Sequence, residues 1–169
     1  MKRRVFLILG SIFGLSSILS SKDTDVLKLS SSLQVKKTIS AVQEHLFPTQ
    51  SLLPSAKSMQ VIEFLFETIM HKTYDKDIRL FILQGAKELE RRERGVFVSL
   101  TFLEKERALR AYENSSYGSS WLSQIMVLTL EAMLSDPIYG SNIHQEAWSA
   151  LGTNGGEPRP KKEYLFDEI

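Results

Sequence analysis

Residues 121–134 restrict the fold more than any other segment, because their sequence, WLSQIMVLTLEAML, is apolar on nearly every side of a helix. Such a helix is stable when other helices enclose it or when it crosses a membrane. The run is shorter than the ~20 residues of a membrane span, and it contains Gln124 and Glu131. We therefore expect residues 121–134 to be the central helix of a helical domain.

Four further segments, at residues 35–46, 59–72, 75–94 and 101–113, carry apolar residues at helical spacing. Their expected buried stripes are, in chain order, Val35, Ile39, Val42 and Leu46; Met59, Ile62, Leu65, Phe66 and Ile69; Ile78, Phe81, Ile82 and Leu89; and Leu103, Leu109 and Tyr112.

Polar residues mark the ends of these segments. Asp75 is placed to cap the third helix, and Thr101 with Glu104 is a capping-box pair at the start of the fourth. Residues 114–120 are expected to separate the fourth helix from the central one. In the charge run at 88–94, Glu88–Arg92 and Glu90–Arg94 have i,i+4 spacing, which favours a solvated face over a docking surface.

The chain changes character after the central helix, where Asp136 and Pro137 stop it. A turn at 138–142 and a short helix at 147–151 are expected next. The tail has little apolar content, so we expect it to be disordered or laid on a partner. No alternating run bounded by hairpin turns is present, so the predicted fold is all-α, a single compact bundle of five or six helices. The expected domains are a leader at 1–22, the helical domain at 23–152 and an extended tail at 153–169.

The first residues have the charged, apolar and polar order of an export leader. Arg3 and Arg4, followed by Val5, Phe6 and Leu7, resemble the core of a twin-arginine signal, which is used by proteins that fold before they cross the membrane. An ordinary export signal is the alternative, and an uncleaved leader could act as a weak membrane anchor. We predict a periplasmic location, in which the protein is either free or associated with the membrane through the complex or an uncleaved leader.

The composition excludes several kinds of chemistry. The formal net charge is +1 without a basic stripe, so nucleic acid is not an expected partner. Cysteine is absent, which rules out disulfides, thiolate nucleophiles and cysteine-held clusters. No phosphate loop, serine elbow or zinc-helix motif occurs. His45, His71 and His144 lie in separate segments, so structural or surface roles are favoured over metal binding. We expect no catalytic, cofactor-binding or metal site in this chain.

The C-terminal half resembles the gluconate 2-dehydrogenase subunit 3 family. The resemblance is carried by residues 128–142, LTLEAMLSDPIYGSN, then by Ala147–Trp148, Leu151–Gly152 and Pro158–Arg159–Pro160. Weaker similarity extends to residues 46–48, 54–56 and 85–89. The hallmark of the family is aspartate-proline-x-tyrosine-glycine-glycine-asparagine with a tryptophan shortly after it. The chain departs from this hallmark at Ser141, where a second glycine is usual, so that a positive φ is less accessible there.

The resemblance implies a non-catalytic small subunit. Its partner would be a large flavoprotein subunit of the glucose-methanol-choline type that binds FAD and oxidises a sugar acid or alcohol. A cytochrome c subunit with haem is a further partner that the resemblance allows. The small subunit would help the flavoprotein to mature and would carry it through the twin-arginine translocon. The rival interpretations are a stand-alone exported binding or chaperone-like protein and an independent exported enzyme.

The family hallmark also suggests which residues matter. We expect a rigid turn beside the flavoprotein interface, because tyrosine and tryptophan are common interface anchors. In the alternative interpretation, the Asp and Asn of this turn only cap and brace it while the Trp fills the core. The residues concerned are Asp136, Pro137, Tyr139, Gly140, Asn142 and Trp148.

Overall fold

The computed structural model describes residues 33–162. The expected leader, with Arg3, Arg4, Phe6 and Leu7, lies outside the described residues, as does the end of the tail. All regular secondary structure in the described part is helical, which confirms the all-α prediction. The α-helices are α3 (Leu33–Leu46), α4 (Val61–Met70), α5 (Lys76–Arg92), α6 (Phe102–Glu113), α7 (Ser116–Leu134) and α8 (Glu146–Ala150). Three 3-10 turns accompany them: η1 (Phe97–Ser99), η2 (Pro137–Tyr139) and η3 (Ile143–Gln145).

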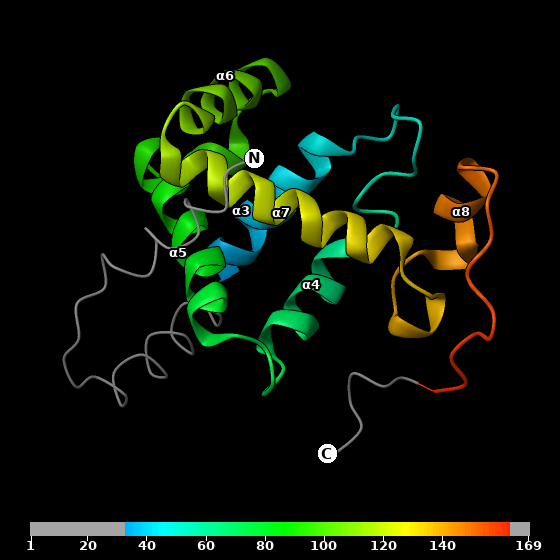
Figure 1. Cartoon of the computed structure of the whole chain (residues 1–169). Coiled ribbons are helices and arrows are strands. Elements are labelled where there is room, and N and C mark those ends of the chain that lie inside the picture. The colour runs from blue at the N-terminus through cyan, green and yellow to red at the C-terminus, as the bar shows by residue number, and fades with distance from the viewer. Residues whose placement is uncertain (1–32, 163–169) are drawn as a thin grey trace.

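Helix α7 is the central element, as the sequence predicts. It runs across the bundle in Figure 1 and packs against α3, α4, α5 and α6, and its C-terminal end meets α8. One side of α7 is buried, and the residues on that side include Trp121, Ile125, Leu128, Ala132 and Met133. Within residues 33–162, no helix has both the length and the hydropathy of a membrane span.

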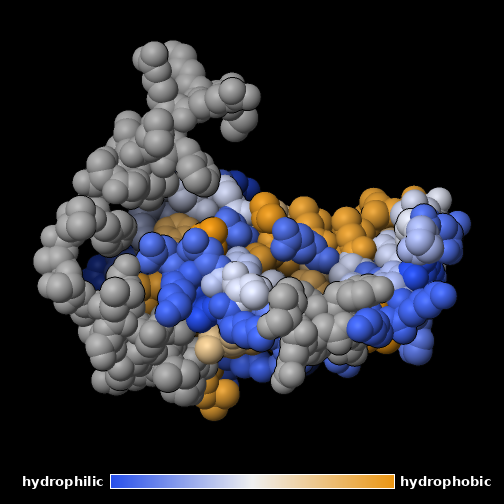
Figure 2. All heavy atoms as spheres, turned by 60° about the horizontal axis from the view of Figure 1, so that its bottom comes forward, coloured by the Kyte–Doolittle hydropathy of each residue, from blue (hydrophilic) through white to orange (hydrophobic). Residues whose placement is uncertain are grey.

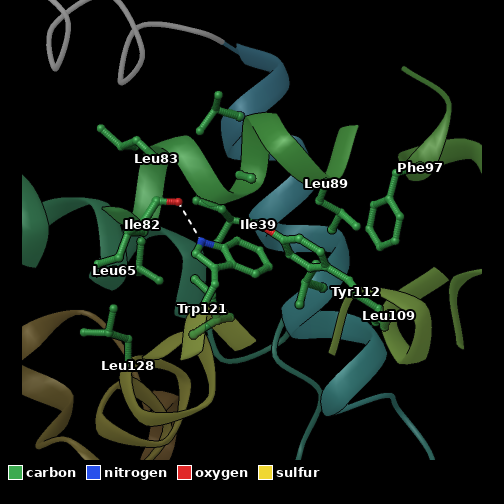
Figure 3. Close-up of a cluster of buried hydrophobic side chains, with 14 of the residues drawn as sticks. Ile39, Leu65, Ile82, Leu83, Leu89, Phe97, Leu109, Tyr112, Trp121 and Leu128 are labelled. Atoms are coloured by element: carbon green, nitrogen blue, oxygen red, sulfur yellow. Dashed lines mark hydrogen bonds between the residues drawn. The ribbon is translucent and has the colours of Figure 1, made fainter. Parts of the chain in front are cut away.

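Trp121 is the largest side chain in the main core, and it is fully buried. Its indole Nε1 donates a hydrogen bond of 2.9 Å to the Ile82 carbonyl oxygen of α5, drawn as a dashed line in Figure 3. The neighbouring Tyr112 hydroxyl donates to the carbonyl oxygen of Gly85, one turn further along α5. Gly85 permits the close approach of the Trp121 ring to α5, because a Cβ at residue 85 would lie 2.0 Å from that ring. The sequence therefore joins α5, α6 and α7 through two aromatic side chains that satisfy their own polar groups.

The helix starts follow the predicted capping. The Asp75 side chain accepts hydrogen bonds from the amides of Asp77 and Ile78 at the start of α5. Thr101 and Glu104 form a reciprocal capping box at the start of α6. A break follows α6 at Glu113 as predicted, but it is shorter than the expected 114–120, because α7 already begins at Ser116. The Ser115 hydroxyl accepts from the Gly118 amide and so caps α7, which lets the new helix begin directly after α6.

Two expected core residues are exposed instead. Ile78 lies outside the core because the neighbouring Arg79 takes the inward position at the start of α5. The Arg79 guanidinium donates to the carbonyl oxygens of Ile69 and His71, which satisfies the C-terminal end of α4. Leu103 is exposed because it is six residues from Leu109, and residues at that spacing lie on different sides of a helix with about 3.6 residues per turn.

The charge run at the end of α5 is only partly as predicted. Glu88 pairs with Arg92 and also with Arg91, both on an exposed face. The predicted Glu90–Arg94 pair is wrong, because the Glu90 side chain is buried. One Glu90 oxygen accepts hydrogen bonds from the Thr38 hydroxyl and the Gln34 amide of α3. This carboxylate therefore joins α5 to α3 rather than facing solvent.

A second, smaller core lies at the C-terminal end of α7. It is formed by residues before and within α4, by the last turns of α7 and by α8, namely Ala56, Met59, Val61, Phe64, Ala132, Met133 and Ala147. This cluster supports the segment in which the sequence places the candidate site.

Candidate functional site

The candidate site is the segment from Ser135 to Trp148, which we call the C-terminal turn. It begins where α7 ends and contains η2, η3 and the first residues of α8. The carboxylate of Asp136 caps η2, because its Oδ1 accepts a hydrogen bond of 3.0 Å from the amide of Ile138. Pro137 occupies the first position of η2, where its missing N–H and fixed φ suit the start of a helical turn. These two residues end α7 and reverse the chain.

The backbone of the C-terminal turn is left-handed at four positions. Gly140 has a φ of 80°, and three non-glycine residues, Asn142, His144 and Gln145, have φ values of 49°, 53° and 60°. Each non-glycine residue in this region costs about 1–2 kcal/mol, least for asparagine. Such conformations persist only where surrounding contacts hold them. The C-terminal turn is thus a strained segment that requires strong bracing.

Two buried polar side chains provide part of this bracing. The Asn142 side-chain amide donates a hydrogen bond of 2.9 Å to the Ser135 carbonyl oxygen and accepts one of 3.1 Å from the Ala147 amide. The Ser141 hydroxyl donates to the Met59 carbonyl oxygen at 2.8 Å. Both side chains are fully buried. Ser141 does not adopt a positive φ, so its departure from the family hallmark introduces no strain there.

Trp148 closes the C-terminal turn onto the end of α7. Its indole Nε1 donates a hydrogen bond of 2.9 Å to the Leu134 carbonyl oxygen, one of those left unpaired at the end of α7. Only 7% of Trp148 is exposed. Tyr139 is partly buried against the second core, whereas Gly140 is exposed. The six residues that the family hallmark suggested therefore all lie within the C-terminal turn.

The described part of the tail packs on the C-terminal turn. The Arg159 guanidinium donates a hydrogen bond of 2.8 Å to Oδ2 of Asp136 and lies over the Trp148 ring, 5.3 Å from its centroid. This bond from Arg159 is the main cause that holds the pKa of Asp136 below its ordinary value. Gly155 lies against the same ring, so close that a Cβ there would be 2.4 Å from it. Up to Lys162, the tail is thus laid on its own chain, where Asp136 supplies the charge that Arg159 pairs with.

These contacts assign internal roles to the residues of the C-terminal turn. Asp136 and Asn142 cap and brace it, and Trp148 fills the space between it and α7. The alternative interpretation of the sequence anticipated these roles. Contact of the same residues with a partner stays a prediction.

The sequence reasoning missed several residues that hold the site. Ser141 was noted only as a departure from the family pattern, although its hydroxyl reaches a carbonyl 82 residues away. Arg159 was noted only for its resemblance to the family. Its place between two prolines was the available signal, since it marks a tail with a stiff backbone rather than a flexible linker.

The histidines of the chain lie apart. His45 is buried, with its Nε2 2.7 Å from a Glu106 oxygen, and its ring stacks on Phe102. His71 contacts the Thr73 hydroxyl, and His144 is exposed in the C-terminal turn. Within residues 33–162, no three histidine, aspartate or glutamate side chains are placed to hold a metal ion together.

Comparison with known families gives one match. A family model described as Gluconate 2-dehydrogenase subunit 3 matches residues 34–156. The matched range includes nearly all of α3, every later helix and the start of the tail up to Gly156. The resemblance found in the sequence is confirmed by this match. Curated proteins and solved structures gave no significant match.

Proposed function

Because the chain belongs to the gluconate 2-dehydrogenase subunit 3 family, we propose that it is a non-catalytic small subunit that helps an FAD-binding dehydrogenase subunit to mature and accompanies it out of the cytoplasm. The observation that carries this proposal is the family match over residues 34–156, which spans most of the chain. In this proposal the large subunit is a flavoprotein of the glucose-methanol-choline type. It holds the FAD and oxidises a sugar acid or alcohol, and a cytochrome c subunit with haem can accept the electrons.

The chemistry of the sequence supports a division of labour between the subunits. The chain has no cysteine and no nucleotide-binding loop, so it lacks the usual residues for holding a cluster or a dinucleotide. Ser141 and Asn142, the two fully buried polar residues of the C-terminal turn, are occupied in bracing that segment. We propose that the redox chemistry belongs to the partner, and that this chain contributes a rigid surface on which the partner folds or docks.

The leader supports the export part of the proposal. Arg3 and Arg4 precede Phe6 and Leu7 in the order of a twin-arginine signal, an address read on folded cargo. A folded flavoprotein bound to this chain could cross with it and would need no leader of its own. We propose that the complex works in the periplasm, attached to the membrane through the complex or through an uncleaved leader.

Co-purification tests the subunit role. The full chain, tagged at its C-terminus and expressed with its neighbouring genes, should bring down a larger partner with the absorbance of an oxidised flavin. That partner should lack a leader, and dehydrogenase activity should follow it. Dehydrogenase activity from this chain purified alone would contradict the proposal. Flavin-free material that never associates with an oxidoreductase would favour a stand-alone binding or chaperone-like protein.

Substitution of the arginine pair tests the export role. The double variant Arg3→Lys and Arg4→Lys should leave both subunits and their activity in the cytoplasmic fraction, since the twin-arginine address depends on the arginines and not on charge alone. Arg91→Lys with Arg92→Lys is a matched control, because it changes an adjacent and exposed arginine pair on α5 and should leave export intact. Normal periplasmic activity in the Arg3 and Arg4 variant would refute the carrier role.

A further inference from the structure

One side of α7 is exposed in this chain and is unusually apolar. Val127 is 48% exposed and Leu134 is 40% exposed, and Met126 and Leu130 beside them are partly buried. These residues follow helical spacing, so their side chains form one continuous strip along the C-terminal half of α7. We call Met126, Val127, Leu130 and Leu134 the α7 strip. Helix α7 crosses the front of the molecule in Figure 1, and the rotation between the two views brings this front toward the upper edge of Figure 2. Apolar surface gathers along that edge.

The exposed side of α7 is also poor in charge. Glu131 is the sole charged residue among the 19 residues of α7, and the other exposed residues on this helix are serines, Tyr117 and members of the strip. A helix side that faces water normally carries charged residues. Depletion of charge, more than apolar character itself, distinguishes the core of a protein interface from the remaining surface.

The exposed sides of the neighbouring helices have the opposite character. Helix α5 exposes Lys87 and the Glu88–Arg91 pair, and α6 exposes Arg107 and Arg110. Beyond the first turn of α6, the exposed sides of both helices are therefore suited to water. The difference shows that the low charge of α7 is a property of this helix and not of the whole surface.

Three exposed apolar residues outside α7 differ from the α7 strip. Val96, Phe102 and Leu103 are 48%, 58% and 67% exposed, but charged residues lie beside them in the chain, such as Arg94 and Glu104. The Phe102 ring also rests on the buried His45 ring, so it has a packing role within the chain.

We propose that the α7 strip is the core of the surface that the dehydrogenase subunit covers in the assembled complex. The inference rests on the proposed function, because family membership supplies the partner: a chain of this family is one subunit of a dehydrogenase complex. The partner surface that fits the strip is itself apolar and uncharged, because a charge placed against these side chains would lose its water without gaining a counter-ion.

The strip is continuous with the braced C-terminal turn. Leu134 ends the strip, and its carbonyl oxygen accepts the indole hydrogen bond of Trp148. Leu151, 45% exposed, follows at the end of α8, which packs against α7. A specific interface buries about 800 Å² on each partner, so the four strip residues form its centre, and exposed residues of the C-terminal turn and Glu131 form its polar rim.

A cysteine-labelling experiment tests this assignment, because the chain contains no cysteine of its own. Val127→Cys places a single thiol in the strip, and Val96→Cys places one outside the strip with the same 48% exposure. In the purified complex, maleimide labelling at 127 should be at least about tenfold slower than in the free chain, since the centre of an interface excludes water and reagent. Labelling at 96 should change less than about twofold. Mass spectrometry of this chain separates its label from labels on the partner.

A charge substitution provides a second test. Val127→Lys should raise the dissociation constant of the complex with the flavoprotein by at least about tenfold, because it buries an unpaired charge. Val96→Lys should change it less than about twofold, and the circular dichroism of both variants should match that of the unchanged chain. Equal labelling at 127 in the free chain and the complex, with the partner bound, would overturn the proposal and leave the subunit role intact.

Other outcomes separate the rival explanations. Absence of any flavoprotein with the unchanged chain would refute the proposed function itself. Protection at 96 but not at 127 would move the interface to the surface around Val96 and overturn the α7 assignment. A strip that is protected in the chain alone, with sedimentation showing a dimer that Val127→Lys dissociates, would assign the strip to a second copy of this chain and also overturn it.

Discussion

Trp121 and Trp148 make the same two interactions in different surroundings. Each indole donates a hydrogen bond of 2.9 Å to a backbone carbonyl oxygen from another element, Ile82 for one and Leu134 for the other. Each ring also rests on a glycine that leaves no room for a side chain. Around Trp121 the partners are long helices, whereas around Trp148 they are a strained turn, the five-residue helix α8 and the tail.

The comparison shows two ways to fix an aromatic side chain. In the main core, apolar helices hold Trp121 from several sides, so it can be released only when the bundle opens. At the C-terminal turn, individual polar contacts from Asn142, Ser141 and Arg159 do much of the work. Segments with few apolar contacts open locally at a lower free energy than the core. We therefore expect the Trp148 region to open separately from the bundle.

The largest expected effect comes from removing each indole in turn. Trp121→Ala should lower the free energy of unfolding by about 3–5 kcal/mol, since it leaves a large cavity in the core. Trp148→Ala should cost less, about 1–2 kcal/mol, because the loss is limited by local opening of the C-terminal turn. Denaturant unfolding followed by helical circular dichroism measures both values. Equal losses would show that the turn and the bundle unfold as one unit and would remove the distinction drawn here.

The glycines beside the two rings give a smaller contrast. At Gly85, the new Cβ of an alanine would lie 2.0 Å from the Trp121 ring. Such overpacking costs about 3 kcal/mol at the upper end, and the gain in helix propensity returns about 1 kcal/mol. Gly85→Ala should therefore lower the free energy of unfolding by about 2 kcal/mol. Thermal unfolding of the full chain is a suitable measurement.

Gly155→Ala is the matched substitution in the tail. Its Cβ would lie 2.4 Å from the Trp148 ring, but the tail can move away from the ring at little cost. The loss should stay below about 1 kcal/mol, because an irregular segment relaxes more easily than a packed helix. A loss at Gly155 as large as that at Gly85 would mean that the tail is held as firmly as the bundle.

The contrast also explains how much of the fold could be predicted from the sequence. Apolar spacing found the helices and the central place of α7, because burial of a stripe is a local pattern. It failed where a charged side chain is buried by partners distant in the sequence. Glu90 was assigned to solvent by its spacing to Arg94, yet its oxygen accepts from Thr38, 52 residues away. Nothing in the segment around Glu90 announces that partner.

The candidate site shows the same limit. Asp136, Gly140 and Asn142 were singled out by the family hallmark, and their residue types suit caps and left-handed positions. Their partners could not, since the Met59 carbonyl and the Arg159 guanidinium come from other parts of the chain. The exposed face of α7 was likewise hidden, because a run that is apolar nearly all round predicts burial on every side.

The smallest expected effect is that of the tail on the C-terminal turn. The Arg159 hydrogen bond holds the pKa of Asp136 below its ordinary value of about 3.9. The folded state therefore favours the ionised carboxylate, and the contact adds stability at neutral pH that is lost as pH falls through the folded pKa. Arg159→Gln should raise the pKa of Asp136 and lower stability slightly at neutral pH. The difference from the unchanged chain should vanish in acid.

Carboxyl NMR titration of Asp136, together with unfolding free energies at several pH values, measures both effects. Arg110→Gln is the control, because Arg110 forms similar ion pairs on α6 with Glu106 and Glu113 and should leave the Asp136 titration unchanged. The tail contact is only one of the two roles of Asp136, since its other oxygen caps η2. Asp136→Ala removes both the cap and the partner of Arg159, so it should destabilise the C-terminal turn more than Arg159→Gln does at neutral pH. If the two variants lost the same free energy of unfolding, the contact with the tail, and not the cap of η2, would be what holds the C-terminal turn in place.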